Sequence, residues 1–141
     1  MVDALRRARR WLAPPYGCVI DVRPADVVPD VEVGCPDGTV LHVGRLVVDD
    51  ERRERHRAAD AAVRETVARG LFTVECQQQF AFCYYPDSAE ELREYIASKW
   101  QHTHLDAPTY SRTADMLRRI PDGRLWMREQ VGIRTLSPRA W

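Results

Sequence analysis

Residues 18–23 read Cys18-Val19-Ile20-Asp21-Val22-Arg23, a short and nearly continuous apolar run that Pro24 ends. Such runs are typical of strands that are buried on both faces of a sheet. Proline ends the run because it has no backbone N–H to donate to a neighbouring strand. The pattern therefore predicts a strand at residues 18–23, and the most central strand of the fold.

The segments on either side of this strand carry their own local signals. Upstream, apolar residues recur at helical spacing from Ala4 to Leu12, and Pro14-Pro15-Tyr16-Gly17 is expected to end that helix. Downstream, Val31–Val33 and Thr39–Val48 flank Cys35-Pro36-Asp37-Gly38, whose Asp-Gly step suits a tight turn. We predict a β-hairpin inserted at this point.

The rest of the chain alternates between helical and extended patterns. The helix predicted at Arg57–Arg69 is followed by a long strand at Phe72–Tyr85, which has one apolar and one wetter face. Ser88 and Glu91 form a capping box before a second helix, and a third helix starts near Asp106 to Thr109. A last strand follows at Arg124–Leu136. The order predicts an α/β fold in a single domain over residues 1–141.

The composition limits the partners and the cellular location that we expect for this protein. Lys plus Arg and Asp plus Glu are 21 each, so no net charge attracts nucleic acid or an anionic membrane. The segment Met1–Leu12 lacks the apolar core of a signal peptide, and no run approaches the roughly 20 apolar residues of a membrane span. We expect a cytoplasmic protein with no nucleic-acid or membrane partner. Its four cysteines, without Cys-x-x-Cys spacing, are expected to be reduced thiols, mostly in the core: Cys18, Cys35, Cys76 and Cys83.

The helix and loop before the first strand resemble a known family. The loop looks like the Leu-x-Pro-Gly-Gly turn of class I S-adenosylmethionine-dependent methyltransferases, with Pro14 and Gly17 in the matching places. The resemblance implies that residues 18–23 are the fifth strand of that fold. It also implies that Phe72–Tyr85 and Arg124–Leu136 are its sixth and seventh strands, an antiparallel pair. The stretch that carries it is Leu5-Arg6-Arg7-Ala8-Arg9-Arg10-Trp11-Leu12-Ala13-Pro14-Pro15-Tyr16-Gly17.

The fold class that the resemblance implies is thus a partial Rossmann-like methyltransferase sheet, with the inserted hairpin and flanking helices. Its function would be that of the acceptor-side half, which binds a small-molecule methyl acceptor. The family holds its cofactor with a Gly-rich turn after the first strand, and no Gly-x-Gly-x-Gly occurs here. We expect no cofactor on this chain alone, and S-adenosylmethionine once a partner chain, or residues upstream in the reading frame, completes the fold.

The strand at Cys18–Arg23 would then lack its earlier neighbour and present an unpaired apolar edge. We therefore expect a homodimer or a complementary chain at this edge. The alternative function is a non-catalytic dimerisation or regulatory module derived from the same fold.

Three residues are candidates for substrate binding. Asp21 and Arg23 lie at the carboxyl end of the predicted strand, where ligands bind in open α/β sheets, although a salt bridge or turn contact explains them equally well. Tyr84 could form an aromatic wall of an acceptor pocket together with Tyr85, Trp100 and Tyr110, and the competing interpretation is core packing. No residue is singled out as a catalytic base.

The segment His102-Thr103-His104-Leu105-Asp106 has alternating metal-binding side chains. The favoured interpretation is a polar connector in which His104 or Asp106 caps the next helix, so no metal site is predicted. Hydrolase, phosphate-loop, zinc-protease and Cys-x-x-Cys redox motifs do not occur in the sequence.

Overall fold

The computed structural model describes residues 1–12 and 17–139, and residues 14–16 of the predicted helix stop lie outside them. Over this part the chain is α/β, with four helices and mostly antiparallel strands. The elements are α1 (Val2–Trp11), β1 (Val19–Pro24), β2 (Asp30–Gly34), β3 (Val40–Arg45), β4 (Val47–Val48), α2 (Asp50–Ala68), β5 (Phe72–Tyr84), α3 (Ala89–Lys99), β6 (Thr103–His104), α4 (Ala107–Arg119) and β7 (Arg124–Pro138).

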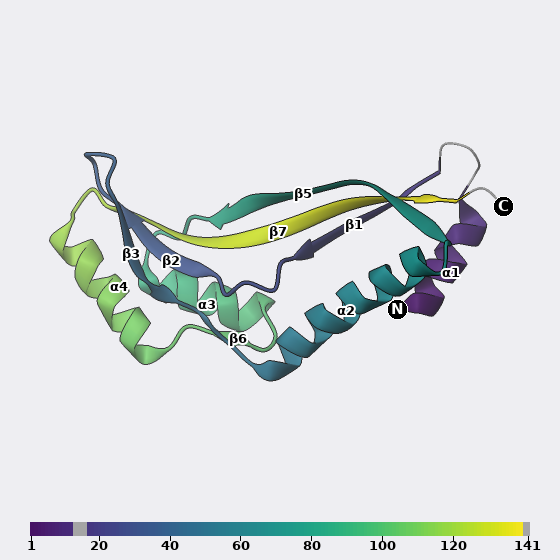
Figure 1. Cartoon of the computed structure of the whole chain (residues 1–141). Helices are drawn as coiled ribbons and strands as arrows, with labels where there is room; N and C mark the ends of the chain where they lie inside the picture. Colours follow the sequence, from purple (N-terminus) through teal and green to yellow (C-terminus); the bar gives the residue numbers. More distant parts are fainter. Residues whose placement is uncertain (13–16, 140–141) are drawn as a thin grey trace. The chain divides into compact units, whose positions relative to one another are not determined.

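Strand β7 is the central strand of the main sheet, because it pairs with β1, β2 and β5. Its residues 131–136 pair antiparallel with β1, and its residues 124–128 pair antiparallel with β2. Strand β3 pairs antiparallel with β2, and β5 pairs with β7 (Figure 1). The short strands β4 and β6 form a separate antiparallel pair.

The chain divides into two compact units. Unit 1 comprises Met1–Asp26, Glu54–Phe80 and Val131–Trp141, and unit 2 comprises Val27–Arg53 and Ala81–Gln130. The prediction of a single domain over residues 1–141 stays a prediction.

Unit 1 has a small core between helix α2 and its strands. Val63 of α2 packs with Phe72 at the start of β5 and Leu136 of β7, both of which are fully buried. Three half-buried residues extend this cluster, namely Leu5 of α1, Leu12 just after that helix, and Val19 of β1. Figure 1 shows α2 along one face of these strands. The side of α2 that faces the sheet therefore carries its buried residues, Ala59, Ala62, Val63 and Thr66.

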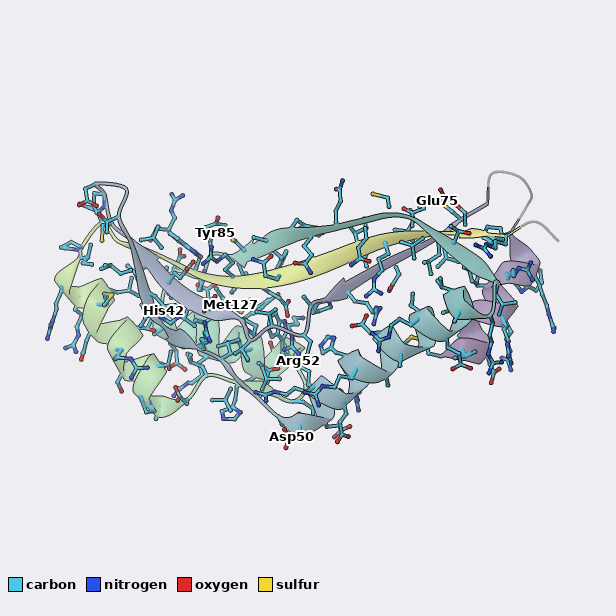
Figure 2. The ribbon with its side chains drawn as sticks, in the orientation of Figure 1. His42, Asp50, Arg52, Glu75, Tyr85 and Met127 are labelled. Atoms are coloured by element: carbon cyan, nitrogen blue, oxygen red, sulfur yellow. The ribbon has the colours of Figure 1, made fainter. Side chains whose placement is uncertain are left out.

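Unit 2 has the larger core. Helices α3 and α4 pack against the β2–β3 hairpin and the first part of β7 (Figure 1). In Figure 2 Met127 points into this core and Tyr85 points away from it, in agreement with exposed fractions of 0% and 57%. The fully buried aliphatic side chains are Val31, Val33, Leu92, Ile96, Leu125 and Met127.

Several local predictions are confirmed. The hairpin turns at Gly38, which has the positive φ of 87° that glycine adopts without strain. The Ser88 side chain accepts a hydrogen bond from the Glu91 backbone N–H at 3.1 Å and so caps α3, and Asp106 caps α4 through the Thr109 N–H at 2.9 Å. Helix α2 begins seven residues before the predicted Arg57, within the charged run that follows Asp49.

The prediction that residues 18–23 form a central strand buried on both faces is wrong. Strand β1 lies at the end of the strand order, and the exposed fractions of Ile20 and Val22 are 62% and 52%. Val19, Asp21 and Arg23 are half-buried because they face α2. Within the described residues no element covers the opposite face of β1, which explains the alternation.

Two further expectations need correction. Strand β5 is exposed on both parities from Glu75 to Phe82, because the described part of the chain packs nothing over its middle. The four free cysteines are exposed or half-buried rather than mostly in the core, since they lie at element ends or on this exposed strand.

Candidate functional site

Four charged side chains form a network inside unit 1. Asp21 and Arg23 are two residues apart on β1, so the alternation of the strand places both on the face that α2 covers. The sheet register pairs Arg134 of β7 directly with Asp21. Asp60 reaches the same place from α2, two positions before the core-facing Ala62. Three elements therefore position the network.

The contact between Arg23 and Asp21 is bidentate, and the other contacts of the network are single. The Arg23 guanidinium donates from Nε to Asp21 Oδ1 at 2.6 Å and from an Nη atom to Asp21 Oδ2 at 2.7 Å. The same Nη atom donates to Asp60 Oδ1 at 3.1 Å. Arg134 donates to that Asp60 oxygen as well, and its Nε lies 3.8 Å from Asp21 Oδ2. Each carboxylate therefore contacts both guanidinium groups, and the Arg23–Asp21 pair has the fork geometry that arginine favours.

The network favours the ionised forms of Arg23 and Asp60. The hydrogen bond to Asp21 raises the pKa of Arg23, against an opposing effect of burial. Burial alone would raise the pKa of Asp60, but the hydrogen bond and charge of Arg134, together with Arg23, outweigh it and lower the pKa. Because both groups hold their charge at neutral pH, the network is suited to binding and positioning rather than to proton transfer.

The network lines an open pocket with a volume of about 150 Å³. A cavity of that size holds a molecule of about six non-hydrogen atoms, as benzene fills an engineered protein cavity of similar volume. The other walls come from the end of β1, from α2, from β7 and from the exposed middle of β5, which supplies three consecutive glutamines. These residues are Pro24, Ala25, Asp26, His56, Gln77, Gln78, Gln79 and Gly132. Such walls offer hydrogen bonds and little apolar contact, so they suit a small polar ligand.

The structure brings two of the three predicted site residues together. Asp21 and Arg23 both line the pocket, and they also form the salt bridge that was the competing interpretation. Their role as substrate ligands stays a prediction. Tyr84 belongs to unit 2, where its ring stacks on Tyr95 with the centroids 3.8 Å apart and its hydroxyl donates to Glu91 at 3.1 Å. Burial and this hydrogen bond raise the pKa of Tyr84.

The other aromatic candidates have structural partners in unit 2. The Arg52 guanidinium lies 5.0 Å from the ring centroid of Trp100, and the Tyr110 hydroxyl donates to Glu90 at 3.0 Å. Tyr85 lies against Trp126, with 6.1 Å between the ring centroids. Packing and hydrogen bonding thus account for their positions.

The segment after α3 behaves as the polar connector that the sequence favours. Asp106 caps α4, Thr103 and His104 form β6, and His102 Nδ1 lies 2.8 Å from Asp49 Oδ2. Over residues 1–12 and 17–139, no three His, Cys, Asp or Glu side chains are grouped so as to hold a metal ion. No helix in the same ranges is long and apolar enough to cross a membrane.

Sequence reasoning missed Asp60, Arg134, His56 and the glutamines as pocket residues. A weak signal existed for Asp60, a charged residue directly beside the core-facing Ala59. Asp60 is separated from Arg23 and Arg134 by 37 and 74 positions, so only the pairing of β1 with β7 and the packing of α2 bring these residues together.

Comparisons of this chain with models of protein families, with curated proteins and with solved structures gave no match.

Proposed function

We propose that this chain is the acceptor-side part of an S-adenosylmethionine-dependent methyltransferase fold. In this proposal β1, β5 and β7 correspond to the last three strands of that fold, and the pocket of unit 1 receives part of a small polar methyl acceptor. The strands that bind the methyl donor come from a partner chain or from residues upstream in the reading frame.

The main support for the proposal is that the outer edge of β1 has no neighbouring strand within the described residues. The resemblance assigns β1 to the fifth strand, which would have an earlier neighbour along that edge. In the described part of the chain β1 pairs with β7 alone, and its exposed Ile20 and Val22 are the apolar surface that further layers of such a fold would cover. The pairing of β5 with β7 in opposite directions also supports it, because the resemblance implies that these two strands are an antiparallel pair (Figure 1).

The position of the pocket is a second support. It lies at the carboxyl end of β1, where Asp21, Arg23 and Pro24 line it, and this is the end at which open α/β sheets bind ligands. The ionised network would orient a polar acceptor through hydrogen bonds. It would not remove the acceptor's proton, so a general base would have to come from elsewhere.

The test is a calorimetric titration with S-adenosylhomocysteine, the product that such enzymes bind without needing the acceptor. The 141-residue chain alone is expected to give no binding heat, because it has no Gly-rich turn. A co-purified complex with a candidate donor-binding segment, taken from upstream in the reading frame or from a neighbouring gene, is expected to bind. Binding by the chain alone, or an assembled complex that does not bind, would overturn the proposal.

The exposed face of β1 favours a second candidate, a non-catalytic module that dimerises or docks through this strand. It differs from the first in needing no donor-binding segment. A stable complex that forms through β1 but has no affinity for S-adenosylhomocysteine would favour the module.

A further inference from the structure

Besides being unpaired in the described residues, strand β1 has a charge pattern that bears on what could pair with its outer edge. Asp21 and Arg23 carry opposite charges at equal distances on either side of Val22. Charged residues at alternate positions normally prevent two sheet edges from joining, because like charges would meet. Here the two signs make the strand complementary to a reversed copy of itself.

The alternation of side chains restricts how two such strands can join. When two copies pair antiparallel about a two-fold axis perpendicular to the sheet, each residue meets a residue of the same face. The axis must then pass beside one residue of β1. An axis at Asp21 would place Asp21 against Asp21 of the second copy, and an axis at Arg23 would place two arginines together. An axis at Val22 places each Asp21 opposite Arg23 of the second copy.

We propose that β1 pairs antiparallel with β1 of a second copy of this chain, about a two-fold axis at Val22. The sheet of unit 1 then continues from one copy into the other. On the face that α2 covers, Asp21 of each copy lies opposite Arg23 of the other, beside the Asp21–Arg23 pair that each chain already forms. The opposed charges extend the network that already joins Asp60 and Arg134.

The opposite face of β1 fits the same register. Val22 meets Val22 of the second copy, and each Ile20 meets Pro24, so that apolar side chains lie next to one another across the join. Ile20 and Val22 are 62% and 52% exposed in the single chain, and their apolar surface would be partly covered by the pairing. Pro24 limits the pairing to the strand itself, since it cannot donate a backbone hydrogen bond.

This inference does not rest on the methyltransferase proposal, because it concerns the 141-residue chain by itself, and it gives the dimerising module of the second candidate function a definite partner and register. Donor-binding strands would use the same edge, so a completed methyltransferase fold and the homodimer would be alternative uses of β1. Failure of the homodimer would leave the calorimetric test of the proposed function unaffected.

The first experiment measures the oligomeric state of the full chain by sedimentation velocity. The wild-type chain is expected to sediment as a dimer of twice its 16.3 kDa mass. Val22→Glu is expected to be monomeric, because two carboxylates would meet at the axis. Val40→Glu is the matched control, a strand valine with 51% exposure that should leave the dimer intact. A monomeric wild type, or a Val22→Glu variant that stays dimeric, would overturn the inference.

A second experiment tests the register with engineered cysteines, after Cys18, Cys35, Cys76 and Cys83 are replaced by serine. Val22→Cys is expected to give a covalent dimer under mild oxidation, because directly opposed residues have Cα atoms within disulfide range. Ile20→Cys is expected to give none, since the two Ile20 positions would lie about 13 Å apart along the strands. Both variants keep the edge apolar, so they do not depend on a destabilising charge. Cross-linking of Ile20→Cys without Val22→Cys would show that another register is used.

Discussion

Asp60 is the residue that ties helix α2 to two strands, because its carboxylate accepts hydrogen bonds from both Arg23 and Arg134. Hydrogen bonds to charged groups each contribute about 1.5–3 kcal/mol when they are well shielded from water. The Asp60 side chain is 34% exposed, so solvent screening reduces that figure.

We expect Asp60→Asn to lower the free energy of unfolding by about 1–2 kcal/mol at neutral pH. The folded-state pKa of Asp60 lies below its ordinary value of 3.8, so this stabilisation is present above that value and is lost as the pH falls through the lower folded-state pKa. Urea denaturation should therefore show a larger difference between variant and wild type at about pH 7 than at about pH 3. Asp115→Asn, at an exposed helix pair with Arg118, is the control and should change little. An equal loss at both pH values would contradict the assignment.

Arg52 has a comparable role in unit 2, where it lies at the start of α2 (Figure 2). It donates to Glu129 at 2.5 Å and to the Thr103 hydroxyl at 2.6 Å. The Glu129 residue is only 5% exposed. Burial raises the pKa of Glu129 and outweighs the opposing charge of Arg52.

We expect Arg52→Met to cost about 3–5 kcal/mol of unfolding free energy near neutral pH, because Glu129 would be left buried without its counter-charge. A carboxyl group with a raised folded-state pKa favours the folded state most below its unfolded pKa, and this contribution is lost as the pH rises. The variant should therefore gain stability relative to wild type as the pH is lowered from about 8 to about 5. Chemical denaturation across this range measures the effect. Adding Glu129→Gln should remove the pH dependence, and a variant whose profile runs parallel to wild type would refute the explanation.

At the scale of elements, the β2–β3 hairpin packs on α4 through a close approach at Gly44 of β3. A Cβ atom at this position would lie 2.8 Å from both the Oγ1 and Cγ2 atoms of Thr109, whose side chain is buried in α4. Such a distance is too short for carbon atoms, so the strand and the helix would have to separate.

We expect Gly44→Ala to destabilise the protein by about 1–3 kcal/mol, the usual cost of an overpacked contact. Gly132→Ala is the matched control, because the nearest atom to its Cβ would be the Arg23 carbonyl oxygen at an ordinary 3.8 Å. Thermal unfolding followed by circular dichroism compares the two. If both variants lose the same stability, the hairpin does not approach α4 at Gly44.

At the scale of the whole molecule, burial is distributed unevenly between the two units. Within residues 1–12 and 17–139, the clustered core of unit 2 contains nine buried apolar residues, whereas that of unit 1 contains three beside the small buried Ala59 and Ala62 of α2. We therefore expect a substitution in the core of unit 2 to be among the most costly in the chain. Leu92→Ala, which empties a fully buried site on α3, should cost about 2–5 kcal/mol.

Val40→Ala provides the comparison within the same unit, because half of the Val40 side chain is already exposed and its truncation leaves no cavity. We expect that variant to lose less than about 1 kcal/mol. Denaturant titration of both variants measures the contrast, and similar losses would mean that burial of Leu92 does not control stability.

Features that depend on neighbours in sequence were predictable. The caps at Ser88 and Asp106 and the turn at Gly38 follow from residues within a few positions, because capping side chains and turn glycines act over one turn of the backbone. Burial along β7 is not set by neighbours in sequence alone, since Leu125 and Met127 are buried at its start, whereas near its other end the buried residue is Leu136, on the opposite parity.

The sequence by itself determined where the helices and most of the strands lie, which residues cap them, and that strand β1 would end at Pro24. Only the tertiary structure decided that β1 is an exposed edge strand and that Asp21, Arg23, Asp60 and Arg134 form one network beside a pocket. The physical reason is the range of the interactions. Backbone preferences and caps act over a few residues, whereas the exposure of a strand and the partners of a charge depend on which distant elements pack against it.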